Sequence, residues 1–386
     1  MNRILASQPT TIFTVMSALA TEHDAINLGQ GFPDSEGPEE VRRAAAEAAL
    51  HGPNQYPPMR GLPELRAAVG AHYDRFYGLG FDPDTEVVVT SGATEALAAC
   101  FLGLIEEGDE VVLFQPLYDS YLPMVQRAGG VGRLIRQTPP DFRVTAELLE
   151  EACSEKTKLI VFNSPQNPVS RVHDRAELEA IAEICTRYDI VAVCDEVWEH
   201  VIFDGRVHVP LMTLPGMRER TVKIGSAGKI FSLTGWKVGW CCAAPPLAEA
   251  VAKAHQFLSF TTPPNLQVAV AHGLALPDDY FTTMRAAFGR SRDRLAAGLS
   301  GLGWRVLPAE GSYFLTVDLA ASGIAMDDDV FCRRLTTELG VAAIPVSAFY
   351  AEEPVKSVAR FCFAKKDATL DTALERLAMV RDGAFA

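Results

Sequence analysis

Residues 86–107 read EVVVTSGATEALAACFLGLIEE and place three kinds of sequence side by side. The run at 86–90 is rich in valine, which favours a strand. A turn of small residues follows, and residues 94–107 then carry the apolar spacing of a helix. A strand that passes through a short turn into a helix is the building unit of an α/β fold.

Four more short apolar runs follow the same pattern, and stretches such as 174–188 between them have helical spacing. They are EVVLF (110–114), KLIVF (158–162), IVAVC (190–194) and TVKIG (221–225). Strands that are apolar along nearly their whole length indicate a sheet buried on both faces, as parallel sheets are. We therefore predict an α/β fold with a mostly parallel central sheet and helices on both faces.

The residues that follow these strands are polar or small. In an open α/β sheet the ligand binds beyond the carboxyl ends of the strands. One rim of the predicted sheet should therefore collect an anion-binding turn, an aromatic ring, an amide, an acid and a lysine. The residues concerned are Gly92, Ala93, Thr94, Tyr118, Asn167, Asp195, Ser226 and Lys229.

The pattern changes after about residue 284. Residues 285–302 have the spacing of an amphipathic helix, and 304–319 alternate as an antiparallel strand pair does. A helix at 327–339 and a strand at 359–364 complete an α+β pattern. We accordingly divide the chain into an N-terminal arm with part of a small domain (1–40), a large ligand-binding domain (41–284) and a small C-terminal domain (285–386).

The charge balance argues against a nucleic-acid surface. Lys and Arg number 35 while Asp and Glu number 49, which gives a formal net charge of −14. Neither nucleic acid nor an anionic membrane surface is therefore an expected partner. The eight cysteines form no CxxC pair, and most lie in apolar runs. We interpret them as reduced core residues of a cytoplasmic protein, without a disulfide framework or a metal site.

The N-terminal segment begins like an export signal, but polar residues at 7–11 interrupt its apolar stretch. We therefore expect no cleaved leader. No stretch reaches the roughly 20 apolar residues that a membrane-spanning helix needs, so no membrane association is expected.

Lys229 lies within SAGKIFSLTGWKVGW (226–240), a segment without an acidic residue. A lysine removed from water loses proton affinity, and its neutral amine is a nucleophile that can form a Schiff base. The alternative is a lysine at a strand end whose ammonium reaches solvent. This segment alone leaves both interpretations open.

Pyridoxal phosphate requires such a lysine, an acid that faces its pyridine nitrogen and a cradle for its phosphate. Asp195 follows a buried strand and can supply the acid, although a helix-capping or loop acid is the alternative. The cradle can be built from backbone N–H groups at a helix start, a hydroxyl and a cation. The candidates are Gly92, Ala93, Thr94, Ser226 and Lys237, while Tyr118 can stack on the ring or simply pack.

Nine stretches together are similar to the fold-type I pyridoxal-phosphate aminotransferases of class I/II. The resemblance is greatest to the branch with glutamine transaminase K (kynurenine aminotransferase) and the bacterial methionine-preferring aminotransferases. It implies a fold like that of aspartate aminotransferase. The stretches are NLGQGFPD (27–34), NQYPPMRGLPELR (54–66), VTSGATEAL (89–97), PLYDSY (116–121), NSPQNP (163–168), DEVWEH (195–200), SAGKIFSLTGWKVGW (226–240), EGSYFL (310–315) and RFCF (360–363).

The resemblance implies a role for each matched residue. Lys229 would be the Schiff-base lysine and the base that moves the proton, and Asp195 would pair with the pyridine nitrogen. Asn167 would bond the ring oxygen, and Tyr118 would stack on the ring. The phosphate would be held by Gly92, Ala93, Thr94, Ser226 and Lys237.

The substrate and the partner subunit are implied in the same way. Arg360 would clamp the substrate carboxylate, and Gly31 would line the substrate site. Tyr56 would reach the phosphate of the neighbouring subunit, which implies a homodimer with a shared active site.

The sequence departs from the family pattern at three places. Trp198 stands where the family usually has a tyrosine that donates to the ring oxygen, and an indole N–H can donate but not accept. The usual NPTG reads NPVS at 167–170, so its glycine is missing. Ala93 and Thr94 replace the usual aromatic or glycine near the phosphate turn.

We predict an aminotransferase that moves an amino group from a neutral L-amino acid to a 2-oxo acid. The side chain would be apolar, aromatic, sulfur-containing or that of glutamine, because no arginine occurs between Arg220 and Arg285 to pair with a distal carboxylate. HQFLSFTTPPNLQ (255–267) suits an apolar pocket wall instead. A cysteine S-conjugate β-lyase on the same scaffold is the alternative, and a non-enzymatic sensor or regulator is a remote one.

Overall fold

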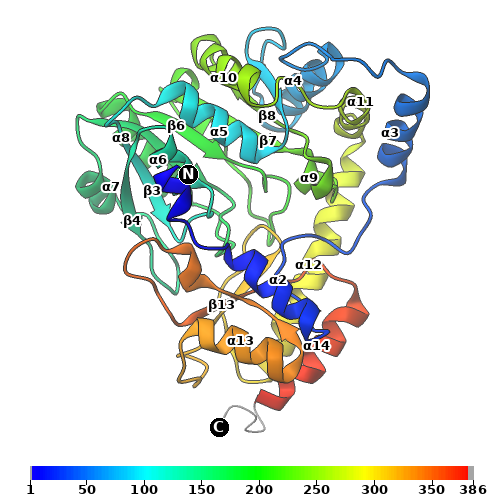
Figure 1. The fold of residues 1–386 in the computed structure, drawn as a ribbon, viewed down its shortest axis with the longest axis vertical. Coiled ribbons are helices and arrows are strands. Elements are labelled where there is room, and N and C mark those ends of the chain that lie inside the picture. The colour runs from blue at the N-terminus through cyan, green and yellow to red at the C-terminus, as the bar shows by residue number, and fades with distance from the viewer. Residues whose placement is uncertain (1, 381–386) are drawn as a thin grey trace.

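The computed structural model describes residues 2–380, and a seven-stranded sheet forms the centre of its larger part (Figure 1). The strand order is β2-β8-β7-β6-β5-β3-β4. Strand β8 runs opposite to the other six strands, which share one direction, so the predicted mostly parallel sheet is confirmed. The strands are β2 (Val87–Thr90), β3 (Glu110–Gln115), β4 (Val131–Arg136), β5 (Thr157–Asn163), β6 (Val191–Asp195), β7 (Thr221–Ser226) and β8 (Gly239–Ala243). The sequence predicted five of them and missed β4 and β8.

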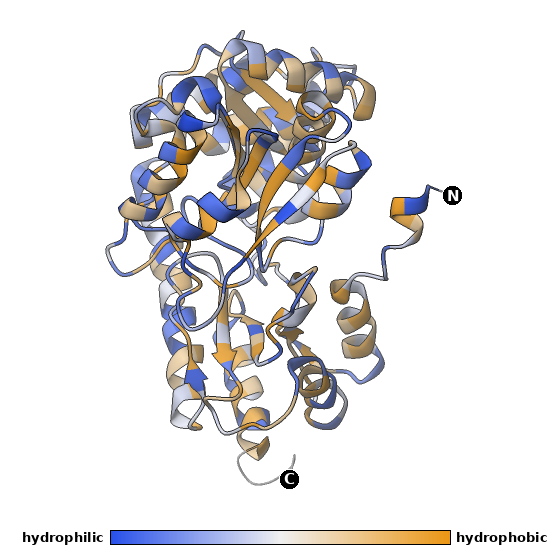
Figure 2. Ribbon diagram, turned by 90° about the vertical axis from the view of Figure 1, so that its left-hand side faces the viewer, coloured by the Kyte–Doolittle hydropathy of each residue, from blue (hydrophilic) through white to orange (hydrophobic). Residues whose placement is uncertain are grey.

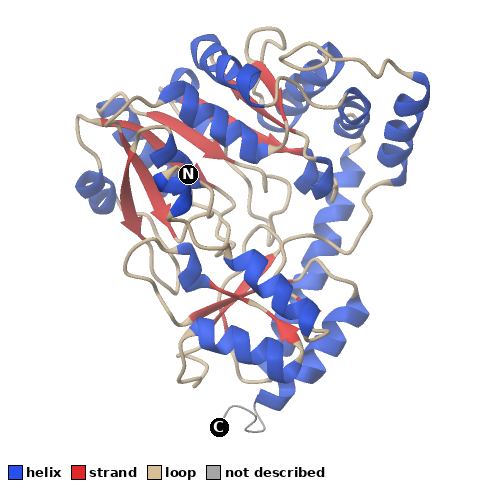
Figure 3. Ribbon diagram, in the orientation of Figure 1, coloured by secondary structure: helices blue, strands red, loops and turns tan. Residues whose placement is uncertain are grey.

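Helices cover both faces of this sheet (Figure 3). Alternate residues of one strand face opposite sides, so Val111 packs in the cluster of α5 while Val112 packs in that of α8. The first face carries α5 (Ala93–Leu104), α6 (Tyr121–Arg127) and α10 (Pro245–Leu258). The second carries α3 (Glu39–His51), α4 (Pro63–Tyr77), α7 (Ala146–Ala152), α8 (Arg175–Arg187) and α11 (Pro264–Leu274). Figure 2 shows hydrophobic strands inside and hydrophilic patches on the outer helices.

A four-stranded antiparallel sheet of order β12-β13-β10-β9 forms the smaller part. Its members are β9 (Arg305–Val306), β10 (Phe314–Asp318), β12 (Ile344–Pro345) and β13 (Val358–Cys362). The predicted antiparallel pair in 304–319 is β9 with β10. Helices α13 (Asp328–Leu339) and α14 (Asp367–Met379) pack here. N-terminal residues join them, because α2 (Ile12–Glu22) contacts α13 and β1 (Ile26–Asn27) pairs with β11 (Val341–Ala342).

The long helix α12 (Asp278–Gly301) runs past both parts (Figure 1). It begins seven residues before the predicted start at 285, because Pro277 precedes it and Asp278 and Asp279 supply an acidic first turn. Phe281 packs near the large sheet, and Leu295 packs with the small one. The predicted boundary at 284/285 therefore lies inside this helix, and the three-part division stays a prediction.

The remaining helical elements are short. They are α1 (Arg3–Ala6), α9 (Ala227–Ile230), η1 (Leu211–Thr213), η2 (Arg218–Arg220), η3 (Thr234–Trp236) and η4 (Val346–Phe349). Within residues 2–380 we find no helix that combines the length and the apolar character needed to cross a bilayer. All eight cysteines are buried and unpaired, as predicted.

Candidate active site

A cavity of about 350 Å³ lies at the carboxyl ends of the large sheet's parallel strands. Residues of the small sheet, including Phe314 and Arg360, complete its wall. The structure brings together every predicted site residue except Tyr56. The residues concerned are Gly31, Gly92, Ala93, Thr94, Tyr118, Asn167, Asp195, Trp198, Ser226, Lys229, Lys237 and Arg360.

Tyr56 lies outside the cavity of its own chain. Its side chain is 84% exposed, and its ring meets that of Phe260 edge to face with 5.7 Å between the centroids. The predicted contact with a neighbouring subunit stays a prediction.

The start of α5 forms a cradle that suits a phosphate. Gly92 is the N-cap with φ 82° and leaves the first N–H groups of a 12-residue helix without a side-chain cap. A Cβ on Gly92 would lie 3.4 Å from the Nζ of Lys237, so the ammonium stands next to the turn. A Cβ on Gly239 would lie 2.7 Å from the backbone nitrogen of Ala93, so that strand must carry a glycine. Free backbone donors beside a cation form an anion site.

Asp195 is buried and hydrogen-bonded to a tyrosine that the sequence analysis did not select. The hydroxyl of Tyr121 donates to Asp195 Oδ2 at 2.6 Å. Burial raises the pKa of the Asp195 carboxyl, and the bond from Tyr121 and the charge of Lys229 oppose that rise. Asn163 Nδ2 donates to the backbone oxygen of Asp195 at 2.7 Å and was also missed. Both residues stand in the quoted motifs PLYDSY and NSPQNP, but the sequence does not say which tyrosine or asparagine faces the acid.

Lys229 lies on α9, directly after β7. Its Nζ donates to the hydroxyl of Tyr313 at 3.2 Å and lies 4.6 Å from the ring centroid of Trp198. Burial lowers the pKa of Lys229 to about 8, although Asp195 raises it in part. The amine can therefore gain and lose a proton near neutral pH. Lys229 is partly buried and lines the cavity, which favours a reactive amine over a lysine whose ammonium reaches bulk solvent.

Arg360 is fully buried on β13 at the cavity wall. Its Nη1 donates to Asn167 Oδ1 at 2.8 Å, and its Nη2 donates to the backbone oxygen of Gly29 at 2.7 Å. Its Nε has no hydrogen-bond partner among residues 2–380. Burial lowers the pKa of Arg360 to about 10, which still leaves a cation at neutral pH. A buried guanidinium with an unused donor can receive a carboxylate.

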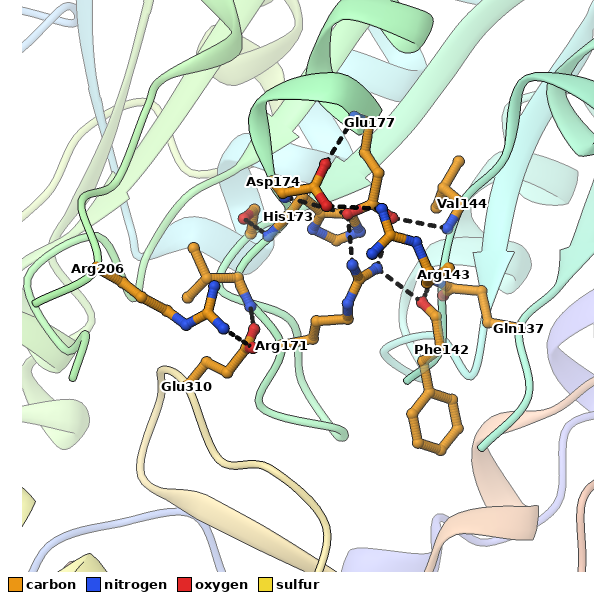
Figure 4. A network of polar contacts seen from close by, with 12 residues as sticks. Gln137, Phe142, Arg143, Val144, Arg171, His173, Asp174, Glu177, Arg206 and Glu310 are labelled. Atoms are coloured by element: carbon orange, nitrogen blue, oxygen red, sulfur yellow. Dashed lines mark hydrogen bonds and ion pairs between the residues drawn. The ribbon is translucent and has the colours of Figure 1, made fainter. Parts of the chain in front are cut away.

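The turn that carries Asn167 is held by a buried ionic network (Figure 4). Arg171 Nη1 donates to Glu177 Oε1 at 2.6 Å, and its Nη2 forms an ion pair with Oε2. The backbone nitrogen of Val172 donates to Glu310 Oε2 at 2.9 Å. Glu310 begins the motif EGSYFL, so the network joins the turn to the segment that leads into β10.

The missing glycine of the NPVS turn is compensated. Ser170 adopts φ 60°, which favours glycine but is open to other residues at a cost. Its Oγ donates to the backbone oxygen of Phe314 at 2.6 Å and bonds Ser312 Oγ at 2.9 Å. These bonds hold the turn without the glycine, and Asn167 lines the cavity.

The chain is similar to known proteins over nearly its whole length. A family model described as aminotransferase class I and II matches residues 23–377. A probable N-succinyldiaminopimelate aminotransferase of Mycobacterium tuberculosis is 44% identical over 97% of this chain and 96% of its own. The methionine aminotransferase of Escherichia coli is 42% identical over 95% of each chain. A kynurenine–oxoglutarate transaminase of Dictyostelium discoideum is 35% identical over 95% of this chain and 93% of its own.

Solved structures give the same result. The N-succinyldiaminopimelate aminotransferase of M. tuberculosis has a TM-score of 0.95 at 44% identity, covering 98% of this chain and 100% of that one. A mutant aspartate aminotransferase of Thermus thermophilus has a TM-score of 0.91 at 31% identity, covering 98% and 99%. The predicted fold and the predicted methionine and kynurenine branch are confirmed, whereas the N-succinyldiaminopimelate relative was not foreseen.

Proposed function

Because this chain belongs to the class I and II aminotransferases, which depend on pyridoxal phosphate, we propose that its amino donor is a neutral L-amino acid and its acceptor a 2-oxo acid. The charged and apolar side chains that line the cavity support this proposal. Among the described residues, the cations that line it are Lys229, Lys237 and Arg360. The first two stand where the cofactor would bind, so Arg360 alone is free for one substrate carboxylate. The remaining wall includes the apolar side chains Phe13, Leu97, Val197 and Phe314.

A second carboxylate on the substrate would therefore be buried without a cation, which is costly. The names of the relatives include substrates of both kinds: methionine has a neutral side chain, whereas N-succinyldiaminopimelate carries further carboxylates. The test is kcat/KM for methionine, phenylalanine and glutamine against aspartate and N-succinyldiaminopimelate. We expect the neutral amino acids to be preferred by about tenfold or more. Preference for either acidic substrate would refute the neutral pocket.

The cavity residues fit pyridoxal phosphate. Gly92, with Ala93, Thr94, Ser226 and Lys237 beside it, would hold the phosphate, and Asp195 would face the pyridine nitrogen, kept in place by Tyr121. When bound, the cofactor supplies an electron sink for the substrate carbon that loses its proton.

The chain's own residues bind the substrate and move the proton. Arg360 would receive the substrate carboxylate, held in position by Asn167 and Gly29. Lys229 would take the proton from the substrate carbon and return it. Trp198 and Tyr118 would close the cavity around the ring and limit the entry of water.

We also propose a homodimer, in which the partner's Tyr56 completes the phosphate cradle. Tyr56 and Phe257 are 84% and 85% exposed, and Leu258 and Phe260 are exposed as well. Such an apolar patch is typical of a surface that a second copy covers. Mixing Lys229→Ala with Tyr56→Ala should restore activity that neither variant has alone, because a mixed dimer contains one intact site. Failure to restore activity in verified mixed dimers would refute the shared site.

The chain is further proposed to be cytoplasmic. Its eight buried, unpaired cysteines support this location, since thiols stay reduced there.

A further inference from the structure

The amine of Lys229 lies against two aromatic side chains that come from distant parts of the chain. Its Nζ donates to the Tyr313 hydroxyl at 3.2 Å and lies 4.6 Å from the Trp198 ring centroid. The two rings meet edge to face, with 4.2 Å between centroids and an interplanar angle of 87°. Both side chains are buried, so they form one packed wall beside the amine.

A second contact orients the hydroxyl of Tyr313. It donates to the backbone oxygen of Gly31 at 2.7 Å. Since a hydroxyl has one proton to donate, it must act as the acceptor toward Lys229. Burial raises the pKa of the Tyr313 phenol well above its ordinary value, so the phenol keeps that proton. Phe314 packs closely against Gly31, since a Cβ added at Gly31 would lie 2.7 Å from Phe314 Cζ, and this packing leaves no room for a side chain at residue 31.

Charged groups on the surrounding elements act on the same amine. Burial is the strongest influence and lowers the pKa of Lys229 to about 8. Asp195 on β6 and Cys362 on β13 raise that pKa, while Arg360 on β13 and Lys237 after η3 lower it. None of these four groups touches the Nζ with a hydrogen bond in the described structure, so the position of the amine depends on its uncharged neighbours.

We propose that Tyr313 is a positioning residue for Lys229, whose Nζ it fixes beside Trp198 and whose protonated form it favours by accepting a hydrogen bond. An acceptor stabilises an ammonium more than a neutral amine, and an indole face attracts a cation. Burial acts in the opposite direction. The balance lets the amine both take and release a proton near neutral pH, as a group that moves a proton must. The inference rests on the proposed role of Lys229.

The test measures the protonation of Lys229 directly. Tyr313→Phe removes the hydroxyl and keeps the ring. The full-length chain, freed of cofactor, is treated with trace acetic anhydride between about pH 5 and pH 10, and acetylation of Lys229 is quantified by peptide mass. We expect the midpoint of the profile to fall by roughly one pH unit, because one hydrogen bond to a charged group is lost. Replacing Tyr313 by 3-fluorotyrosine, a weaker acceptor of similar size, should move the midpoint part of the way.

Tyr350→Phe is the matched control. Its hydroxyl also donates to a buried backbone oxygen, that of Gln137 at 2.7 Å, but Tyr350 does not line the cavity. The control should leave the Lys229 profile unchanged. A profile that is the same in the wild type and in both Tyr313 variants would overturn the positioning role.

A second readout separates this inference from the role of Lys229 itself. Borohydride reduction of the cofactor-loaded Tyr313→Phe chain should still place the label on Lys229. If the label is on Lys229 but the acetylation profile is unchanged, the positioning role of Tyr313 is refuted and the role of Lys229 stands. If the label is on another lysine, the role of Lys229 is refuted, and the positioning role of Tyr313 is refuted with it.

Discussion

Arg360 donates a hydrogen bond from Nη1 to Oδ1 of Asn167, across 2.8 Å, and so joins two residues that are 193 positions apart. Arg360 lies on β13 of the small sheet, and Asn167 follows β5 of the large one. The bond therefore links the proposed contact for the substrate carboxylate to the proposed contact for the cofactor's ring oxygen. Arg360 is also packed on the Phe314 ring, with 3.9 Å from Cζ to the ring centroid.

This geometry predicts the effect of Arg360→Lys. A lysine cannot bond Asn167, Gly29 and a carboxylate at once in the planar manner of a guanidinium. We expect KM to rise roughly tenfold to a hundredfold for several amino acids alike, with a smaller change in kcat. Steady-state kinetics with three donors would check this. A loss confined to one donor would instead place Arg360 against the side chain of the substrate.

Borohydride reduction of the cofactor-loaded protein should attach the pyridoxyl group to Lys229. Two other lysines are close in sequence. The Nζ of Lys223 is held between Glu196 and Glu199 at 2.5 and 2.7 Å, and Lys237 lies beside Gly92 at the proposed phosphate site. Lys223 does not line the cavity, and Lys237 is expected to face the phosphate and not the ring. Peptide mass mapping reads the site of attachment, and label on Lys237 or Lys223 would contradict the assignment.

Asp195→Asn should keep the cofactor bound yet slow turnover by about a hundredfold or more, because a neutral amide replaces the buried carboxylate that we propose faces the ring nitrogen. Tyr121→Phe is the matched milder change, since it removes only the 2.6 Å bond to that carboxylate. Tyr121→Phe should slow turnover less than Asp195→Asn does. Single-turnover spectroscopy with an amino acid would measure both, and near-normal rates in Asp195→Asn would mean that another group faces the nitrogen.

The sequence predicted much of this site because its chemistry is concentrated at strand ends. Short apolar runs predicted five strands. Residues at or shortly after the ends of those strands line the cavity, among them Gly92, Tyr118, Asn167, Asp195 and Ser226. The antiparallel β8 was missed because GWCCA at 239–243 has no turn or helix pattern that separates it from the lysine segment. Tyr121 was passed over for Tyr118 because only the orientation of α6 decides which ring meets Asp195. Tyr313 contacts Lys229 across 84 positions, and no local pattern reports such a contact.

Arg171→Met should destabilise the fold by about 3–5 kcal/mol, because it leaves the buried Glu177 carboxylate without its partner. The same change at Arg175 is the control, since its ion pair with Glu179 is 60% and 58% exposed and such pairs contribute about 0.5 kcal/mol or less. Urea unfolding followed by circular dichroism would compare the two. Equal midpoints for both variants would show that the network in Figure 4 does not stabilise the Asn167 turn.

The buried pair of Lys223 and Glu196 predicts how stability depends on pH. Burial alone would raise the pKa of Glu196, but Lys223 and His208 outweigh it and lower that pKa to about 2. A carboxyl whose pKa is lower in the folded state stabilises the fold above its unfolded value of about 4.3, and this contribution is lost as pH falls toward 2. The free energy of unfolding of the wild type should therefore decline over that range.

Lys223→Met tests this contribution. Without the ammonium, the pKa of Glu196 rises, so the variant should lose about 3–5 kcal/mol at neutral pH and show a flatter acid decline. Lys253→Met is the control, because Lys253 is 73% exposed beside Glu249. It should follow the wild type at every pH. If the acid decline of Lys223→Met were as steep as that of the wild type, carboxyls other than Glu196 would have to account for the acid lability.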